Sequence, residues 1–181
     1  MDSHRATSAA RLNLLGLLGT SGVLLVAFTD QLVLGELPCP LCLLQRAGFV
    51  GIGIGFLLNL RCGASPAHYG VILISAIAGA LVASRQVMLH IVPGSGAYGS
   101  ALFGLHFYTW ALIGFAAAVL FAALTLFVEK FGERTGAAST PWPRVAAWLF
   151  VLVVAANAVS TLLECGLGPC ADNPTGYLWL E

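Results

Sequence analysis

Two close pairs of cysteines are the residues of this 181-residue chain whose types and spacing could do chemistry. The first pair, Cys39 and Cys42, lies in the stretch LPCPLCLLQR, and the second, Cys165 and Cys170, lies in ECGLGPCADNPTGYLWLE. A disulfide across a CxxC spacing closes a very small ring, and such rings are usually strained and reducible. Because a thiolate attacks a disulfide through a mixed disulfide, two such pairs could exchange electrons.

The surroundings of Cys42 favour a reactive thiol over a structural disulfide. An apolar segment begins right after Cys42, so the thiol is expected near a helix N-terminus, whose partial positive charge favours the thiolate. Arg46 lies about one turn further along and adds a full positive charge. A structural disulfide needs neither feature, and it stays open as the less favoured alternative.

The four paired cysteines could also hold a structural zinc ion as thiolates. Thiols outside the cytosol meet oxidants, however, and no small soluble domain surrounds these two pairs. We therefore predict redox chemistry and no metal site.

The composition indicates an all-α integral membrane protein that forms a single membrane domain. Hydrophobic residues make up 59% of the chain and charged residues 9%, against about 25% charged residues in a soluble domain. The net charge is zero and no long basic run is present, which excludes a nucleic-acid partner and leaves membrane lipid. A span needs about 20 apolar residues, and five stretches qualify, at about 12–34, 43–60, 69–91, 101–128 and 145–163, followed by a tail over 164–181.

The first stretch could also be read as a cleaved signal peptide, because His4, Arg5 and Arg11 precede or begin it. Its apolar run is too long for a typical signal peptide, and no small-residue cleavage site follows it. We therefore expect it to remain as the first span.

The distribution of Lys and Arg predicts the orientation in the membrane. If the spans alternate, six of these residues fall on one side: Arg5, Arg11, Arg61, Lys130, Arg134 and Arg144. Arg46 alone falls on the other side, and positive charge stays cytoplasmic. The N-terminus is thus predicted to be cytoplasmic, and the C-terminus and both cysteine pairs to lie outside. Cys62 alone falls on the cytosolic side, where thiols stay reduced.

Electrons that pass between two cysteine pairs must finally leave the protein. The sequence has no haem motif, no GxGxxG fingerprint and no ferredoxin-type cysteine run. A quinone dissolved in the membrane is then the economical acceptor, and Arg46 is placed to stabilise the charge that develops on it.

Three stretches closely resemble the bacterial disulfide-bond-formation protein B family, over about residues 12–128. They are PCPLCLLQR directly before a span, SRQVMLH at 84–90 and HFYTWALIGF at 106–115. This resemblance implies a four-helix bundle in the bacterial inner membrane. It also implies a thiol:quinone oxidoreductase that reoxidises a periplasmic DsbA-like oxidase of the thioredoxin fold and passes the electrons to ubiquinone or menaquinone.

The resemblance also implies roles for individual residues. Cys39 and Cys42 would be the pair beside the quinone, with Cys42 handing over the electrons and Arg46 stabilising that state. Three more candidates for quinone binding follow from the second stretch: Arg85, Gln86 and His90. Arg is common in the family at the first of these positions, whereas the Gln and His that follow are exchanged relative to the usual family pattern.

The chain departs from the family in its second cysteine pair. The family carries that pair in the loop between spans three and four, and this loop has no cysteine here. We expect the segment over 97–108 to form a short helix lying on the periplasmic membrane surface. Cys165 and Cys170, which follow an extra fifth span, would replace the missing pair, accept electrons from the partner and pass them to Cys39 and Cys42.

Three other functions stay open. A vitamin K epoxide reductase-like enzyme also joins a CxxC, a second cysteine pair and a quinone in a helical bundle. A membrane thiol reductase would run electrons outward. A membrane protein without enzymatic activity would use both pairs as structural disulfides.

Overall fold

The computed structural model describes residues 2–92, 94, 96–129 and 141–180, and within them the chain forms five long helices. Their bounds are α1 (Asp2–Val33), α2 (Pro40–Cys62), α3 (Pro66–Leu89), α4 (Phe107–Val128) and α5 (Trp142–Cys165). All five are long and apolar enough to cross a membrane, α1 from Ala9 onward. The all-α membrane architecture with a fifth span is thus confirmed.

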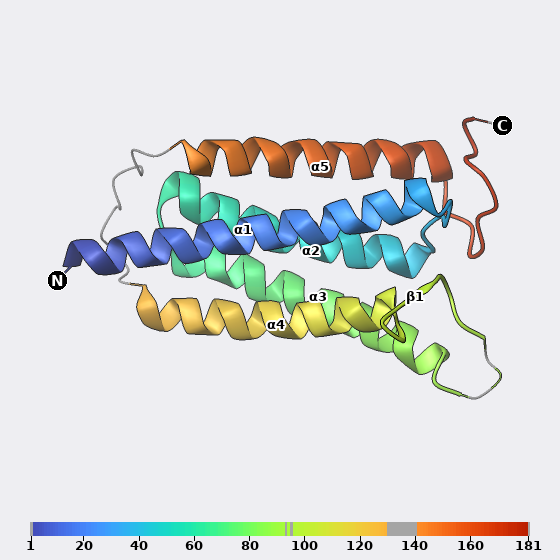
Figure 1. Ribbon diagram of the computed structural model, residues 1–181, viewed down its shortest axis with the longest axis horizontal. Coiled ribbons are helices and arrows are strands. Elements are labelled where there is room, and N and C mark those ends of the chain that lie inside the picture. The colour runs from blue at the N-terminus through green and yellow to red at the C-terminus, as the bar shows by residue number, and fades with distance from the viewer. Residues whose placement is uncertain (1, 93, 95, 130–140, 181) are drawn as a thin grey trace.

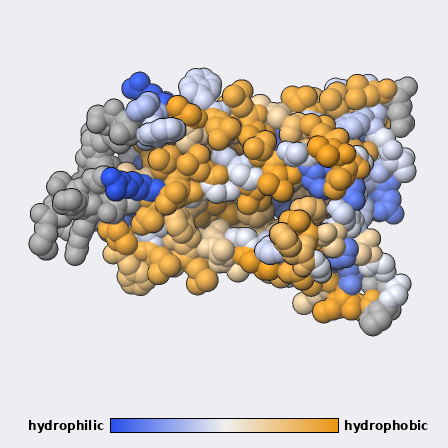
Figure 2. Space-filling view, in the orientation of Figure 1, coloured by the Kyte–Doolittle hydropathy of each residue, from blue (hydrophilic) through white to orange (hydrophobic). Residues whose placement is uncertain are grey.

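Consecutive helices run in opposite directions, so the connections alternate between the two ends of the bundle (Figure 1). The α1–α2 connection, the segment between α3 and α4, and the C-terminal tail all lie at one end. Helix α5 packs on α1 and α2, on the side away from α3 and α4. Hydrophobic residues cover the middle of the visible face and hydrophilic residues gather toward its ends, as expected for a bundle surrounded by lipid (Figure 2).

Helix α2 begins at Pro40, three residues earlier than the sequence suggested. Proline suits the first turn of a helix, because its fixed φ is helical and its missing N–H has no partner there. The Sγ of Cys39 accepts a hydrogen bond from the backbone N–H of Cys42 at 3.2 Å and so caps the helix. Cys42 therefore lies inside the first turn of α2, with Cys39 just outside it.

The predicted surface helix over 97–108 is wrong, because residues 101–106 form a small β-hairpin and α4 begins directly after it at Phe107. Strands β1 (Ala101–Leu102) and β2 (Leu105–His106) pair in an antiparallel register. Between them, Phe103 and Gly104 have φ of 51° and 80°, as the favoured two-residue hairpin turn requires at both central positions. Glycines at 94, 96 and 99 also have positive φ, which prevents a helix from extending through this stretch.

The core is closely packed where α2, α3 and α4 meet. A side chain on Gly79 would come within 2.3 Å of the Phe115 ring, and the Cβ position of Gly48 is 3.2 Å from Gly79 Cα. Phe115 is fully buried and stacks on Phe49 with ring centroids 4.2 Å apart. Small residues let helix backbones approach closely in membranes, where van der Waals packing drives association.

A polar cluster lies at the end of the bundle opposite the four paired cysteines. Asn59 Nδ2 donates to Asn13 Oδ1 at 2.8 Å, and Tyr69 Oη donates to Glu129 Oε2 at 2.8 Å. Asn13 Nδ2 in turn donates to Tyr69 Oη at 2.9 Å, so that these bonds join α1, α2 and α3 to the end of α4. Cys62 is exposed at this same end of α2. The predicted cytoplasmic residues Lys130 and Arg134 lie outside the described residues.

Candidate functional site

Cys39 and Cys42 lie at the end of the bundle that also carries the hairpin and the tail. Both are free thiols in the structure, and Cys39 is buried with 7% of its surface exposed. Hydrogen bonding to Cys42 and then burial raise the pKa of the Cys39 thiol well above its ordinary value. Cys39 is therefore held as a protonated donor beside the sulfur of Cys42.

The side chain of Gln86 on α3 contacts both sulfurs. Its Nε2 lies 3.3 Å from Cys39 Sγ and 3.5 Å from Cys42 Sγ. Its Oε1 accepts a hydrogen bond from Gln45 Nε2 at 2.7 Å. Gln86 is 1% exposed, so this amide forms the inner wall of the thiol site.

Arg46 reaches from α2 toward α1 and α5. Its Nη1 donates to Gln31 Oε1 at 2.7 Å and to Asn157 Oδ1 at 3.2 Å, and its Nη2 donates to the Ala27 carbonyl at 2.8 Å. A guanidinium has five N–H donors. These three bonds leave two donors with no acceptor among the described residues.

Cys42 and Arg46 both line a cavity of about 510 Å³. Ligand pockets have volumes of roughly 300–1,000 Å³ and are mostly apolar with a few placed polar groups. The walls come from α1, α2, α4, the connection between α1 and α2, and residues 98–102 in and before the hairpin. Most lining side chains are apolar, among them Leu24, Leu37, Phe49, Phe107 and Trp110. The polar lining residues include Asp30, Glu36, Cys42, Gln45, Arg46, Tyr98 and Tyr108.

The segment before the hairpin closes over the connection between α1 and α2. Tyr98 Oη donates to the Leu37 carbonyl at 2.6 Å, and the backbone N–H of Ser100 donates to Glu36 Oε2 at 2.9 Å. Burial raises the pKa of Tyr98, so the phenol stays protonated as the donor. These two bonds hold the hairpin segment against the residues that precede Cys39.

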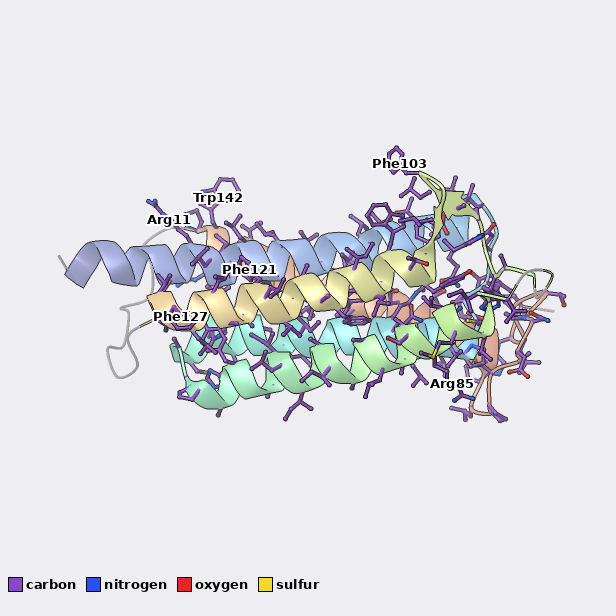
Figure 3. All side chains as sticks on the ribbon, turned by 90° about the horizontal axis from the view of Figure 1, so that it is seen from below. Arg11, Arg85, Phe103, Phe121, Phe127 and Trp142 are labelled. Carbon is purple, nitrogen blue, oxygen red and sulfur yellow. A yellow bond between two sulfur atoms is a disulfide. The ribbon has the colours of Figure 1, made fainter. Side chains whose placement is uncertain are left out.

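The structure separates Arg85, Gln86 and His90, the three residues near the end of α3 that were expected beside a quinone. Arg85 is exposed and points away from the bundle (Figure 3), and none of these three side chains lines the cavity. His90 Nδ1 lies 2.8 Å from the Gln86 carbonyl, and its ring stacks on Tyr108 with centroids 5.2 Å apart. Of the three, Gln86 alone contacts the cysteine sulfurs among the described residues.

Cys165 and Cys170 form a disulfide at the end of α5. Cys165 is the last residue of the helix and is buried with 6% of its surface exposed, whereas Cys170 lies in the loop and is partly exposed. The tail then folds back, because the backbone N–H groups of Leu178 and Trp179 donate to the carbonyls of Glu164 and Leu163 at 3.3 and 3.1 Å. The tail is thus docked on α5.

Sequence reasoning missed the inward polar face of α5. Asn157, Ser160 and Glu164 are all about 95% buried at helical spacing in an apolar helix. Both carboxylate oxygens of Glu164 are buried without a hydrogen-bond partner among the described residues. Polar residues inside a span are costly and usually functional, so their 3–4 residue spacing was the signal that could have revealed this face.

Across residues 2–92, 94, 96–129 and 141–180, no three His, Cys, Asp or Glu side chains are arranged to share a metal ion. Cys39 and Cys42 are free thiols, and Cys165 and Cys170 form a disulfide.

Comparisons with known proteins point in one direction. The family model "Disulfide bond formation protein DsbB" matches residues 9–125. A relative named "Disulfide bond formation protein B" from Marinobacter nauticus is 45% identical over 79 residues, which cover 40% of this chain and 46% of that protein. Proteins of the same name are 41% identical over 85 residues in Xanthomonas axonopodis pv. citri and 40% identical over 84 residues in Nitrosomonas eutropha. Each of these matches covers 44% of this chain, and they cover 49% and 52% of those proteins.

The chain spans about half the length of the curated relatives it matches. No solved structure matches it. Helix α5 and the tail lie beyond the matched region. Because the family model covers well over half of the residues, including both cysteines of the CxxC and the four-helix core, this membrane protein belongs to the DsbB family of disulfide bond formation proteins.

Proposed function

We propose that this chain is a thiol:quinone oxidoreductase that makes disulfides for a periplasmic DsbA-like thiol oxidase. The observation that carries the proposal is the shared position of Cys42 and Arg46 on the wall of a mostly apolar cavity. The Cys42 thiol can give up electrons, and the Arg46 cation can stabilise negative charge. Both line a space that suits an apolar electron acceptor. Membership of the DsbB family supports the same chemistry.

The tail disulfide receives electrons from the partner. A thiolate of the partner attacks Cys170 Sγ, because Cys170 is the more exposed of the two tail cysteines. A bond forms between these two sulfurs, the Cys165–Cys170 bond breaks, and Cys165 leaves as a thiolate that takes up a proton. The second thiol of the partner resolves the mixed disulfide, so the partner is oxidised and the tail pair is reduced by two electrons.

The reduced tail pair then reduces the disulfide form of Cys39 and Cys42. The reduced inner pair finally transfers two electrons and two protons to the quinone, which leaves as quinol, and the bond between Cys39 and Cys42 forms again. The net reaction converts one dithiol and one quinone into one disulfide and one quinol.

The lining of the cavity fits a ubiquinone or menaquinone headgroup. Its apolar walls suit a flat ring with an isoprenoid chain, and two N–H donors of Arg46 remain for a carbonyl oxygen of the ring. Cys42 in the first turn of α2 is near the partial positive charge of the helix N-terminus, which favours the thiolate. Bound quinone would supply the two-electron acceptor.

The proposed orientation puts this end of the bundle on the periplasmic side of the bacterial inner membrane. The N-terminus and Cys62 would then be cytoplasmic. The excess of Lys and Arg in the connections at the opposite end supports this orientation.

The test is reduction of decylubiquinone by the purified full-length protein with dithiothreitol as the electron donor, after subtraction of the uncatalysed rate. Wild type should reduce the quinone, and Cys42→Ser should lose the catalysed rate. Cys62→Ser, which removes an exposed thiol at the other end of the bundle, is the matched control and should keep it. A Cys42→Ser protein with the wild-type rate would falsify the proposal.

A second experiment separates the relay from structural disulfides. Cells are depleted of quinone, and free thiols are trapped by acid quenching and alkylation. A relay should accumulate in the reduced form, because its electrons have no outlet. Structural disulfides would stay oxidised under the same conditions.

A further inference from the structure

Gln31 on α1 lies between the cation of the acceptor site and the tail. It is 2% exposed. Its Oε1 accepts from Arg46 Nη1 at 2.7 Å, and its Nε2 donates to Ser160 Oγ at 2.8 Å and to Tyr177 Oη at 3.1 Å. A flipped amide would turn its N–H groups toward the guanidinium, which has donors only. The surroundings therefore define one orientation for this side chain.

Asn157 on α5 accepts a hydrogen bond from the same nitrogen of Arg46. Its Nδ2 donates to the Val153 carbonyl at 2.9 Å, so its Oδ1 is the atom that faces Arg46 at 3.2 Å. Asn157 is 5% exposed. It also lies outside the region matched by the family model, so the fifth helix adds a group to the site that the matched core lacks.

Among the residues that the structure describes, Tyr177 attaches the tail to this network. The Tyr177 hydroxyl accepts from Gln31 Nε2, and the next two residues, Leu178 and Trp179, are bonded through their backbone to the end of α5. The tail carries the Cys165–Cys170 disulfide. One buried amide thus contacts both the cation at the cavity and the segment that brings electrons to it.

We infer that Gln31 and Asn157 are positioning residues for Arg46, and that Gln31 also docks the redox tail through Tyr177. The fifth helix and the tail are then parts of the acceptor site and not merely carriers of the second cysteine pair. This inference rests on the proposed thiol:quinone function. It predicts that a substitution of Asn157 impairs the reaction with quinone alone, and that a substitution of Tyr177 impairs electron transfer from the tail alone. A substitution of Gln31 should impair both.

Three variants of the full-length protein divide the network. Asn157→Leu removes a bond to Arg46 and leaves the tail contact, whereas Tyr177→Phe removes the tail contact and leaves Arg46. Gln31→Leu removes both. Thr161→Val is the control on α5, because the Thr161 hydroxyl bonds the Asn157 carbonyl of its own helix at 2.9 Å. Asn157→Asp keeps an acceptor oxygen for Arg46, so it should keep the wild-type value of the property that Asn157→Leu changes.

The acceptor side is measured as KM and kcat for decylubiquinone. A hydrogen bond to a charged group is worth enough to change an equilibrium about tenfold when it is lost. Asn157→Leu and Gln31→Leu should therefore raise KM by about this factor, with a smaller change in kcat. Tyr177→Phe and Thr161→Val should leave KM unchanged.

The tail side is measured without quinone. Dithiothreitol is added to the fully oxidised protein, samples are alkylated over time, and mass spectrometry reports when each cysteine pair becomes reduced. Docking at Gln31 should restrict the motion of the tail and so raise its effective concentration for the encounter with the inner pair. Tyr177→Phe and Gln31→Leu should therefore slow the transfer to Cys39 and Cys42 severalfold, and Asn157→Leu should not.

The inference is overturned if Asn157→Leu and Gln31→Leu keep the wild-type KM, or if Tyr177→Phe transfers electrons at the wild-type rate. It stays testable even if wild type reduces no quinone at all, an outcome that overturns the proposed function. In that case the rate of Cys42 alkylation by iodoacetamide reports the charge of Arg46 one turn away. Asn157→Leu and Gln31→Leu should lower this rate, and an unchanged rate in both would reject the positioning role.

Discussion

Gln45 and Gln86 join α2 to α3 through a hydrogen bond of 2.7 Å, from Nε2 of the first to Oε1 of the second. Because the oxygen of Gln86 faces Gln45, its nitrogen faces the sulfurs of Cys39 and Cys42. One contact between two buried amides thus aims a hydrogen-bond donor at the thiol pair.

Replacement of Gln86 by leucine should destabilise the bundle at this contact. The side-chain N–H of Gln45 would stay buried without a hydrogen-bond acceptor, and such an unpaired donor lowers the free energy of unfolding by about 1–3 kcal/mol. The thermal unfolding midpoint in detergent measures the effect. Met88→Leu, an exposed position on the same helix, should unfold like wild type. Equal midpoints for Gln86→Leu and this control would contradict the contact.

Arg46 and Arg85 should differ sharply when each is replaced by methionine. Arg46 lines the cavity, whereas Arg85 is exposed on the far side of α3. Arg46→Met should lower kcat/KM for decylubiquinone at least about tenfold, the effect of one lost charged hydrogen bond, and Arg85→Met should stay within about twofold of wild type. A comparable loss in both variants would show that the exposed cation also serves the acceptor.

Attack on the tail disulfide should occur at Cys170. Oxidised protein is treated with glutathione at low concentration, and the mixed disulfide is mapped by mass spectrometry after alkylation at acidic pH. Because Cys165 is buried and Cys170 is partly exposed, the glutathione adduct should be found on Cys170 and the alkyl group on Cys165. The reverse labelling would refute this order of events.

Cys39 should remain unreactive toward iodoacetamide in the reduced protein until the pH is well above that needed for an ordinary thiol. Hydrogen bonding to Cys42 and burial raise its pKa, and a thiol with a raised pKa stays protonated as the pH passes through the usual range. Since the thiolate is the nucleophile, the rate should begin to rise only at high pH. Alkylation of Cys39 as fast as that of glutathione at pH 8 would argue against this environment.

Gly79→Ala should lower the stability of the helix bundle. The new methyl group would lie 2.3 Å from the ring of Phe115, which is fully buried, stacks on Phe49 and already lies close to Gly48 on its other neighbour helix. Overpacking of this kind costs about 1–3 kcal/mol. Gly70→Ala on the same helix is the matched control, because nothing lies within 4 Å of the added carbon. That variant should be as stable as wild type or slightly more stable, and a greater loss there than at Gly79 would contradict the packing.

Much of this protein can be read from its sequence because the signals are local. Long apolar stretches determine five spans, since backbone polar groups in lipid are satisfied within a helix. The spacing of Cys39 and Cys42 before a span, with Arg46 one turn later, predicts where the chemistry lies. The hairpin after α3 was harder to predict from the sequence than the spans were. Its apolar residues between the glycines are equally suited to a helix on the membrane surface.

The tertiary structure decided which polar side chains meet. In lipid, apolar residues are accommodated on every side of a helix, so composition along a span does not define how the helix is rotated about its axis. Packing against neighbouring helices sets that rotation, and it turns Gln86 inward and Arg85 outward. The same packing brings Gln31 and Asn157, which lie far apart in the chain, to a single nitrogen of Arg46. The sequence by itself determined the spans and the positions of the two cysteine pairs along them, whereas contacts between remote helices determined which side chains surround those pairs.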